Sequence, residues 1–210
     1  VGVQVLSNAI DPELWRLEPE SPDGELIVAA VMRLAPRKRG DRLLRIAHQV
    51  KDQNSSGLRI RFQIAGDGPL AGKLRRQARS MGLEDTVEFL GDLNHAGLRA
   101  LFARSCLFIL PSELESFGLA GLEARAAGLP VVAMGASGVS SWLQSEVEGL
   151  LAQDEAQLVE QVMRLITDEP MRNNITAHNR TTDVTRTWVS ALREHEGVYA
   201  DAIRLIKDAG

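Results

Sequence analysis

Short apolar segments alternate with helix-like segments through most of this 210-residue chain, and this alternation constrains the fold more than any other feature. The segments that favour strands are residues 26–32, 58–65, 86–90, 106–110, 130–134 and 149–152. Those with helical spacing are residues 43–50, 69–81, 96–104, 119–127, 156–167, 171–178 and 186–206. Repeated strand–helix alternation produces right-handed βαβ units. The sequence therefore predicts an α/β fold with a parallel sheet of about six strands and helices on both faces.

Composition narrows the function classes. A net charge of −4 and an aromatic content of 4% argue against nucleic acid as a partner. The one cysteine, Cys106, opens a buried-looking strand, which favours a small core residue over a catalytic thiol and indicates a reducing, cytoplasmic setting. No apolar stretch approaches the roughly 18 residues of a membrane-spanning helix, and no signal peptide is visible. The chain begins at Val1 without a Met, so we expect that a targeting segment or a whole domain has been left out.

A basic cluster follows the first predicted strand. Its members are Arg33, Arg37, Lys38, Arg39, Arg42 and Arg45. Arg42 and Arg45 are expected on a solvated helix face. Arg33 and Lys38 bracket the strand-to-helix turn at the carboxyl edge of the sheet, where ligands bind in open α/β folds. A forked guanidinium and an ammonium at that place suit a diphosphate.

A glycine-rich loop, GDGPLA at residues 66–71, follows the second predicted strand and opens a helix. It matches the G-x-G-x-x-A variant of the dinucleotide fingerprint, with Glu88 and Asp92 roughly 20 residues further on. Pro69, expected at the tolerated first helical position, removes one N–H that a pyrophosphate needs. The loop leaves open a nicotinamide or flavin oxidoreductase, although its glycines are also explained by a tight turn.

Two carboxylates, Glu115 and Glu123, lie eight residues apart after the fourth predicted strand. A strand end that feeds a helix N-terminus offers unpaired N–H groups to an anion. One glutamate before the helix and one two turns into it can flank a phosphate-bearing ligand with hydroxyl groups, such as a nucleotide sugar. The alternative is two unrelated carboxylates, one capping the helix and one exposed on it.

The surrounding residues resemble a known family. Residues 111–118 read PSELESFG, a second glutamate follows at Glu123, and residues 126–133 read AAGLPVVA. Arg33 and Lys38 have the matching five-residue spacing, and AGDGP at 65–69, FLG at 89–91 and NAID at 8–11 are also similar. This pattern resembles the retaining glycosyltransferases of the GT-B fold, family-four group, and covers nearly the whole chain.

The resemblance implies a Rossmann-like domain that forms the C-terminal half of a two-domain enzyme. It implies that Arg33 and Lys38 hold the diphosphate of a UDP- or GDP-sugar, that Glu123 accepts the ribose hydroxyls, and that Leu93 lies against the base. The implied catalytic residue is Glu115, which faces the transferred sugar with the backbone amides of Ser116, Phe117, Gly118 and Leu119. Neither a metal nor a further cofactor is implied, because the basic residues and the helix N-terminus supply positive charge.

The resemblance also implies a division of the chain. Residues 1–24 form an interdomain connector, residues 25–184 the nucleotide-sugar-binding domain, and residues 185–210 a helix that packs toward a missing N-terminal acceptor domain. We expect this fragment alone to be inactive, and the full enzyme to associate peripherally with a membrane. A stand-alone binding subunit that needs a separate partner is the alternative.

The sequence departs from the family pattern at three places. Residues 137–141 read SGVSS, without the glutamate that the family carries in this segment, so its contacts are in question. Gly121 and Arg125 replace the apolar or small residues usual in the glutamate helix, and a mid-helix glycine costs about 1 kcal/mol relative to alanine.

Overall fold

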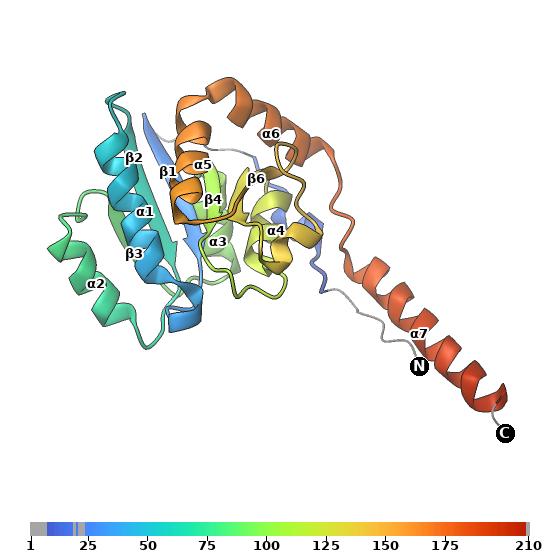
Figure 1. Cartoon of the computed structure of the whole chain (residues 1–210). Coiled ribbons are helices and arrows are strands. Elements are labelled where there is room, and N and C mark those ends of the chain that lie inside the picture. Colours follow the sequence, from blue (N-terminus) through green and yellow to red (C-terminus); the bar gives the residue numbers. More distant parts are fainter. Residues whose placement is uncertain (1–7, 19, 21–23, 209–210) are drawn as a thin grey trace.

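A six-stranded parallel sheet forms the centre of the protein (Figure 1). The computed structural model describes residues 8–18, 20 and 24–208, so part of the predicted connector at 1–24 lies outside the described residues. The strands are β1 (Glu25–Val31), β2 (Arg59–Ala65), β3 (Val87–Gly91), β4 (Leu107–Leu110), β5 (Val131–Met134) and β6 (Gly149–Ala152). Their order is β3-β2-β1-β4-β5-β6, and every neighbouring pair is parallel. This confirms the predicted Rossmann-like α/β fold.

Helices cover both faces of the sheet. One face packs against α1 (Gly40–Gln53), α2 (Ala71–Ser80), α5 (Glu155–Thr167) and α6 (Glu169–Thr181). The other face packs against α3 (His95–Ala103), α4 (Leu119–Ala126) and the short helix η1 (Pro12–Trp15). Alternate residues of β1 enter the two cores, because successive side chains of a strand point to opposite faces: Val28 and Ala30 pack on one side, Ile27 and Ala29 on the other.

The strand order reverses at the centre of the sheet. β1 pairs with β2 on one side and with β4 on the other. The chain therefore leaves the carboxyl ends of β1 and β4 in opposite directions, which opens a crevice between them. In open α/β sheets this crevice is where ligands bind.

The observed helices and strands differ from the predicted ones mostly by one to three residues at their ends, within the usual uncertainty of such boundaries. One difference is structural. Pro69 was expected at the first position of a helix, but α2 begins at Ala71 with Leu70 as its N-cap, and Pro69 lies in the preceding turn. The turn is longer because the Leu70 N–H bonds to the Leu34 carbonyl at 2.9 Å, which holds this segment against the end of β1.

The described part of the predicted connector contains a short helix, η1. Trp15 of η1 is only 2% exposed, and its ring lies 5.0 Å from that of His95 and 5.5 Å from that of Phe102. These ring contacts and the burial hold η1 against α3 on the second face of the sheet.

The last helix, α7 (Trp188–Asp208), extends away from the sheet (Figure 1). It carries a row of exposed apolar side chains that are 55% to 67% accessible: Trp188, Val189, Leu192, Tyr199 and Ile203. No helix in the described part of the chain is long and apolar enough to cross a membrane.

Candidate functional site

Two adjoining cavities lie at the carboxyl edge of the sheet, and Val31 at the end of β1 lines both of them. The first, here called the Leu93 cavity, has a volume of about 400 Å³. It is lined by Val31, Met32, Arg33, Ala65, Gly66, Asp67, Asp92, Leu93 and Leu98. The second, the Glu115 cavity, has a volume of about 240 Å³. It is lined by Asn8, Val31, Lys38, Leu110, Glu115, Ser116, Phe117, Gly118, Leu119 and Ala120.

The predicted site residues gather at these two cavities. Arg33 and Leu93 line the first, and Lys38 and the segment 115–119 line the second. Glu123 lines neither, but it follows Leu119 and Ala120 by four and three residues on α4, which places it on the same helix face. Residues that sequence reasoning did not assign to the site include Asn8 and Ala120, although Asn8 begins the segment 8–11 that resembles the family.

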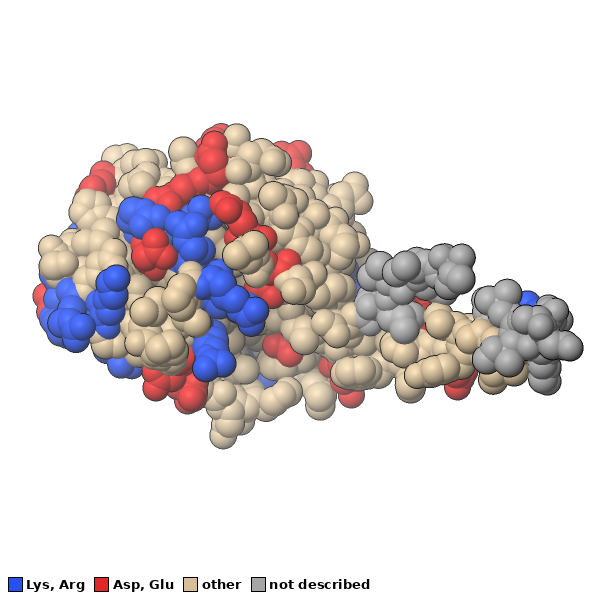
Figure 2. Space-filling view, turned by 60° about the horizontal axis from the view of Figure 1, so that its bottom comes forward, with Lys and Arg blue, Asp and Glu red and all other residues tan. Residues whose placement is uncertain are grey.

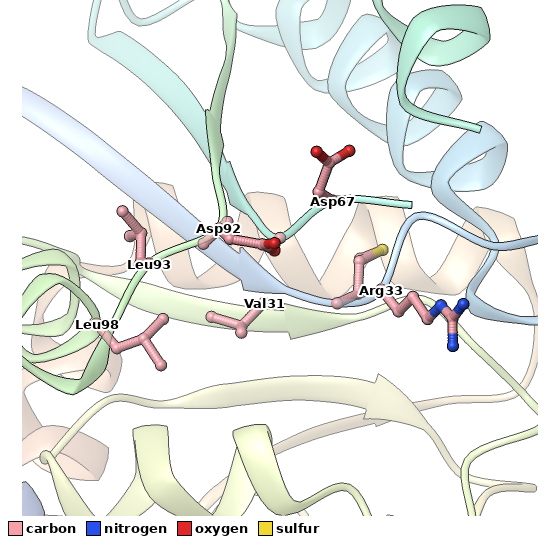
Figure 3. A pocket seen from close by; sticks show the side chains of 9 residues that line it. Val31, Arg33, Asp67, Asp92, Leu93 and Leu98 are labelled. Atoms are coloured by element: carbon pink, nitrogen blue, oxygen red, sulfur yellow. The ribbon is translucent and has the colours of Figure 1, made fainter. Parts of the chain in front are cut away.

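The Leu93 cavity has an apolar end and a charged end. Figure 3 shows Val31, Leu93 and Leu98 together on one side and the Arg33 guanidinium on the other. In this view the Asp92 carboxylate lies between the apolar side chains and Arg33, and the Asp67 carboxylate lies above them. A flat, partly apolar group fits the first side, and an anion fits the second.

The Glu115 cavity contains an ion pair. The Lys38 ammonium lies 2.5 Å from a carboxylate oxygen of Glu115, and both side chains are mostly buried, at 21% and 13% exposure. Lys38 ends the short helix η2 (Pro36–Lys38) that follows β1, whereas Glu115 lies in the loop after β4. The pair therefore joins the two sides of the crevice at the point where the strand order reverses.

The start of α4 leaves N–H groups unused in the same cavity. The backbone N–H groups of residues 116–120 donate to no acceptor within the described part of the chain, whereas those of Gly121 and Leu122 bond to the Gly118 carbonyl. Gly118 itself has φ 79°, and a Cβ there would lie 2.7 Å from a methyl carbon of Val139. Only glycine fits this turn without strain. The result is a helix N-terminus open to an anion.

Among the described carboxyl groups, Glu123 has the largest shift of its pKa. Burial raises its pKa to about 7, and no described residue donates a hydrogen bond to its side chain or pairs with it. A half-buried carboxylate without a partner next to a cavity is a typical site for a ligand that brings hydroxyl donors.

The glycine loop of residues 66–71 is explained by packing. A Cβ at Gly66 would lie 2.0 Å from the Met32 carbonyl oxygen, and one at Gly68 would lie 2.6 Å from that of Leu34. The N–H groups of Gly68, Leu70 and Ala71 already have acceptors, in Asp67, Leu34 and Gly68. The start of α2 therefore has fewer donors for a pyrophosphate than the start of α4.

Arg42 corrects one sequence prediction. It was expected on a solvated helix face, but it is only 7% exposed. Its guanidinium donates to the Pro111 carbonyl at 3.0 Å and to the Glu113 carboxylate at 2.7 Å. Arg45, the other residue of that prediction, forms a two-bond pair with Glu155 at 2.7 Å on α5 while staying partly exposed. Arg33 and Lys38 of the basic cluster thus line the cavities, whereas Arg42 fixes the loop before Glu115 and Arg45 joins α1 to α5.

The segment without the family glutamate contacts the Glu115 loop through other groups. The Gly138 N–H donates to the Glu115 carbonyl at 2.7 Å, and the Trp142 indole N–H donates to the Phe117 carbonyl at 2.7 Å. Gly121 is explained by the same contact region, because a Cβ there would lie 2.6 Å from Leu110 and 3.5 Å from the Trp142 ring. Sequence reasoning missed Trp142, which stands outside every motif that resembles the family.

Arg125, the other departure in the glutamate helix, is 4% exposed and donates to the Thr182 carbonyl at 2.8 Å. Its role is therefore to hold the end of α6 against α4.

The carboxyl edge faces the reader in Figure 2, where Lys and Arg side chains form a band with acidic residues at its margins.

Among the described residues, no three His, Cys, Asp or Glu side chains are placed to hold a metal ion.

Comparison with known proteins identifies the family. The family model described as "Glycosyl transferases group 1" matches residues 11–182. The chain belongs to this glycosyltransferase family. The predicted resemblance to family-four glycosyltransferases of the GT-B fold is thereby confirmed at the level of family and fold.

Relatives of this glycosyltransferase chain are longer proteins. It is 30% identical over 167 residues to the phosphatidylinositol N-acetylglucosaminyltransferase gpi3 subunit of Schizosaccharomyces pombe, a match that covers 79% of the chain and 36% of that relative. It is 32% identical over 193 residues to the D-inositol 3-phosphate glycosyltransferase of Salinispora arenicola, with coverage of 87% and 42%. The chain thus spans less than half the length of these curated relatives.

A similar fold is found in Alr3699/HepE of Anabaena, whose crystal structure contains UDP and glucose. The TM-score is 0.79 at 22% identity, and the match covers 94% of the glycosyltransferase chain and 56% of the Anabaena chain. At this identity the likeness concerns the fold.

Proposed function

We propose that this chain binds a nucleotide-diphosphate sugar and forms the donor half of a retaining, metal-independent glycosyltransferase. The observation that carries the proposal is the junction of the two cavities. The Leu93 cavity, with an apolar end and Arg33 at its charged end, adjoins the Glu115 cavity. The latter combines Lys38, Glu115 and the N–H groups of residues 116–120, which have no acceptor in the described part of the chain.

Each part of a nucleotide sugar has a matching group. The base lies in the Leu93 cavity against Leu93, and the ribose hydroxyls donate to the half-buried Glu123. The diphosphate lies between Arg33 and Lys38, with the N–H groups of residues 116–119 bonded to its oxygens. The transferred sugar lies next to Glu115.

The chemistry that these groups support is departure of a nucleoside diphosphate. When the bond between the sugar and the diphosphate breaks, negative charge grows on the diphosphate oxygens. Arg33, Lys38 and the α4 N-terminus stabilise that charge from fixed positions, as electrostatic preorganisation requires, so a metal ion is not needed. In the retaining reaction the acceptor hydroxyl attacks the same face of the sugar, and the leaving diphosphate helps to take its proton.

The acceptor binds elsewhere in our proposal. We assign residues 1–24 to a connector, 25–184 to donor binding, and 185–210 to a helix that packs on an acceptor domain. The row of exposed apolar side chains on α7 supports this assignment, because soluble proteins rarely expose contiguous apolar surface without a partner. We also propose a reducing, cytoplasmic setting, with Cys106 unpaired, and a peripheral membrane association of the full enzyme.

A second candidate is a subunit whose acceptor-binding part is a separate protein. The relative from Schizosaccharomyces pombe is named as a subunit of its transferase, which supports dependence on a partner, although the match covers only 36% of that relative. The length of the reading frame that encodes the chain distinguishes the two, since a subunit of this kind needs little more than 210 residues.

Calorimetric titration of the chain with UDP-glucose, GDP-mannose and NAD tests the proposal. We expect binding of one of the two nucleotide sugars and none of NAD. A companion ¹⁵N spectrum should show shifts of the Gly118 amide rather than of the Gly68 amide. Binding of NAD with shifts at Gly68 would instead support the oxidoreductase, and absence of any nucleotide-sugar binding would refute the proposal. In the longer enzyme, Lys38→Ala and Glu123→Ala should each depress turnover strongly.

A further inference from the structure

Two hydrogen bonds fix the orientation of the loop that carries Glu115. The Glu115 carbonyl accepts from the Gly138 N–H, and the Phe117 carbonyl accepts from the Trp142 indole N–H, each at 2.7 Å. Both donors come from the segment after β5, which lies outside the loop itself.

In a trans peptide the C=O and the following N–H point in opposite directions, and the structure has no cis peptide bond among its described residues. A donor that holds the Phe117 carbonyl therefore also fixes the direction of the Gly118 N–H. The Gly138 N–H, which holds the Glu115 carbonyl, fixes the direction of the Ser116 N–H in the same way. Ser116 and Gly118 line the Glu115 cavity, and neither N–H has an acceptor in the described part of the chain.

The donors themselves are firmly placed. Ser137 is 5% exposed and bonds to the Met134 carbonyl at 2.7 Å, which ties the segment to the end of β5. Val139, which is fully buried, packs in the same core as Phe117. Gly138 approaches the loop so closely that a Cβ would lie 1.9 Å from the Ser116 carbonyl oxygen.

We propose that Trp142 is a positioning residue of the donor site: its indole N–H turns the Phe117–Gly118 peptide so that the Gly118 N–H points at the diphosphate. Trp142 directly follows residues 137–141, the segment that lacks the family glutamate. The inference rests on the proposed function, because it takes the bound anion to be the diphosphate of a nucleotide sugar. The indole ring also lies against α4 at Gly121, so the same side chain fixes both the last peptide before the helix and the helix itself.

The experiment compares the chain with its Trp142→Phe variant, which keeps an aromatic ring but removes the N–H donor. Trp188→Phe is the matched control, because Trp188 is 58% exposed on α7 and lines neither cavity. Each protein is titrated with UDP, GDP, uridine, guanosine and inorganic pyrophosphate while the ¹⁵N amide signals are followed. We expect Trp142→Phe to bind the active nucleoside diphosphate and pyrophosphate about five- to tenfold more weakly, with unchanged affinity for the nucleoside, as loss of one orienting hydrogen bond predicts. Trp188→Phe should match the parent chain.

Two results would overturn the inference. One is a Trp142→Phe variant that binds pyrophosphate and the nucleoside diphosphate as tightly as the parent. The other needs no variant and compares the hydrogen-exchange rates of two indole N–H groups. If the Trp142 indole N–H exchanges with solvent as fast as that of Trp188, it is not hydrogen-bonded to Phe117. Pyrophosphate binding at Gly118 without binding of either nucleotide would refute the proposed function alone, because the anion site would still be present.

Discussion

The unusual titration of Glu123 predicts how donor binding depends on pH. Burial raises the pKa of this carboxyl from 4.5 to about 7, and no described residue donates a hydrogen bond to it. In the proposed mode of binding the ribose hydroxyls donate to the ionised carboxylate, so a bound nucleotide sugar should lower this pKa toward its ordinary value. Binding therefore selects the deprotonated form, and affinity should rise with pH through 7.

The magnitude follows from the pKa. With a pKa of about 7, roughly nine-tenths of the free chains hold the Glu123 proton at pH 6, and roughly one-tenth hold it at pH 8. Affinity should therefore increase about tenfold from pH 6 to pH 8, and binding at pH 6 should release about 0.9 proton for each site. A nucleotide sugar is the right ligand, because its diphosphate lacks the terminal phosphate group that ionises near pH 6 in a nucleoside diphosphate.

Calorimetry in buffers with different ionisation enthalpies measures the released protons directly. Glu123→Gln is the matched control, since it keeps the size of the side chain but cannot ionise; it should bind more weakly and without this pH dependence. The unliganded chain provides a second check. A carboxyl whose pKa is raised by folding lowers stability as pH rises from about 4.5 to about 7, so Glu123→Gln should unfold at a higher temperature than the parent at pH 8 and at the same temperature below pH 4. Equal affinities at pH 6 and pH 8 would refute both the ribose role and the reasoning from burial.

Three further perturbations test other parts of the structure. Gly118→Ala puts a residue with a Cβ in a backbone conformation with φ 79°, and that Cβ would lie 2.7 Å from Val139. We therefore expect a loss of about 1–3 kcal/mol in the free energy of urea unfolding, together with weaker pyrophosphate binding. An unchanged urea midpoint would contradict this. Arg42→Met leaves the Pro111 carbonyl without its donor and should lower the free energy of unfolding by about 1–3 kcal/mol. Arg45→Met, which removes bonds to the partly exposed side chains of Asp41 and Glu155, should lower it less. The reverse order in urea melts would show that the loop does not depend on Arg42. The double variant Leu192→Ser, Tyr199→Ser changes exposed side chains that line neither cavity, so it should leave nucleotide binding intact; a fall in binding would mean that α7 contributes to the donor site.

The sequence predicted most of the fold because its signals were local. Strands such as those at residues 26–32 and 130–134 are marked by apolar runs, and turn residues separate them from the helices. These patterns involve only neighbouring residues, so they can be predicted without the tertiary structure. The parallel arrangement then followed from the handedness of βαβ units. Pro69 was misplaced because its turn is held by the Leu34 carbonyl, which lies on another strand-to-helix connection.

The site was only partly predictable. Arg33, Lys38 and Glu115 follow strand ends, and Glu123 lies on the helix after β4, so their positions follow from the order of elements. The supports behind the loop come from residues distant in sequence: Arg42 reaches Pro111 across 69 positions, and Trp142 reaches Phe117 across 25. Arg42 has the spacing of a surface residue and is buried where the loop after β4 and Glu155 of α5 contact it. No local pattern carries that information.

The location of both cavities within a single chain has a consequence for turnover. A nucleoside diphosphate that has lost its sugar keeps its contacts with Leu93, Glu123, Arg33, Lys38 and the α4 N-terminus in the proposed mode of binding. It loses only what the sugar contributed near Glu115. The spent nucleotide should therefore compete with fresh donor as a strong product inhibitor, and its escape, rather than the chemical step, should limit the rate of the complete enzyme.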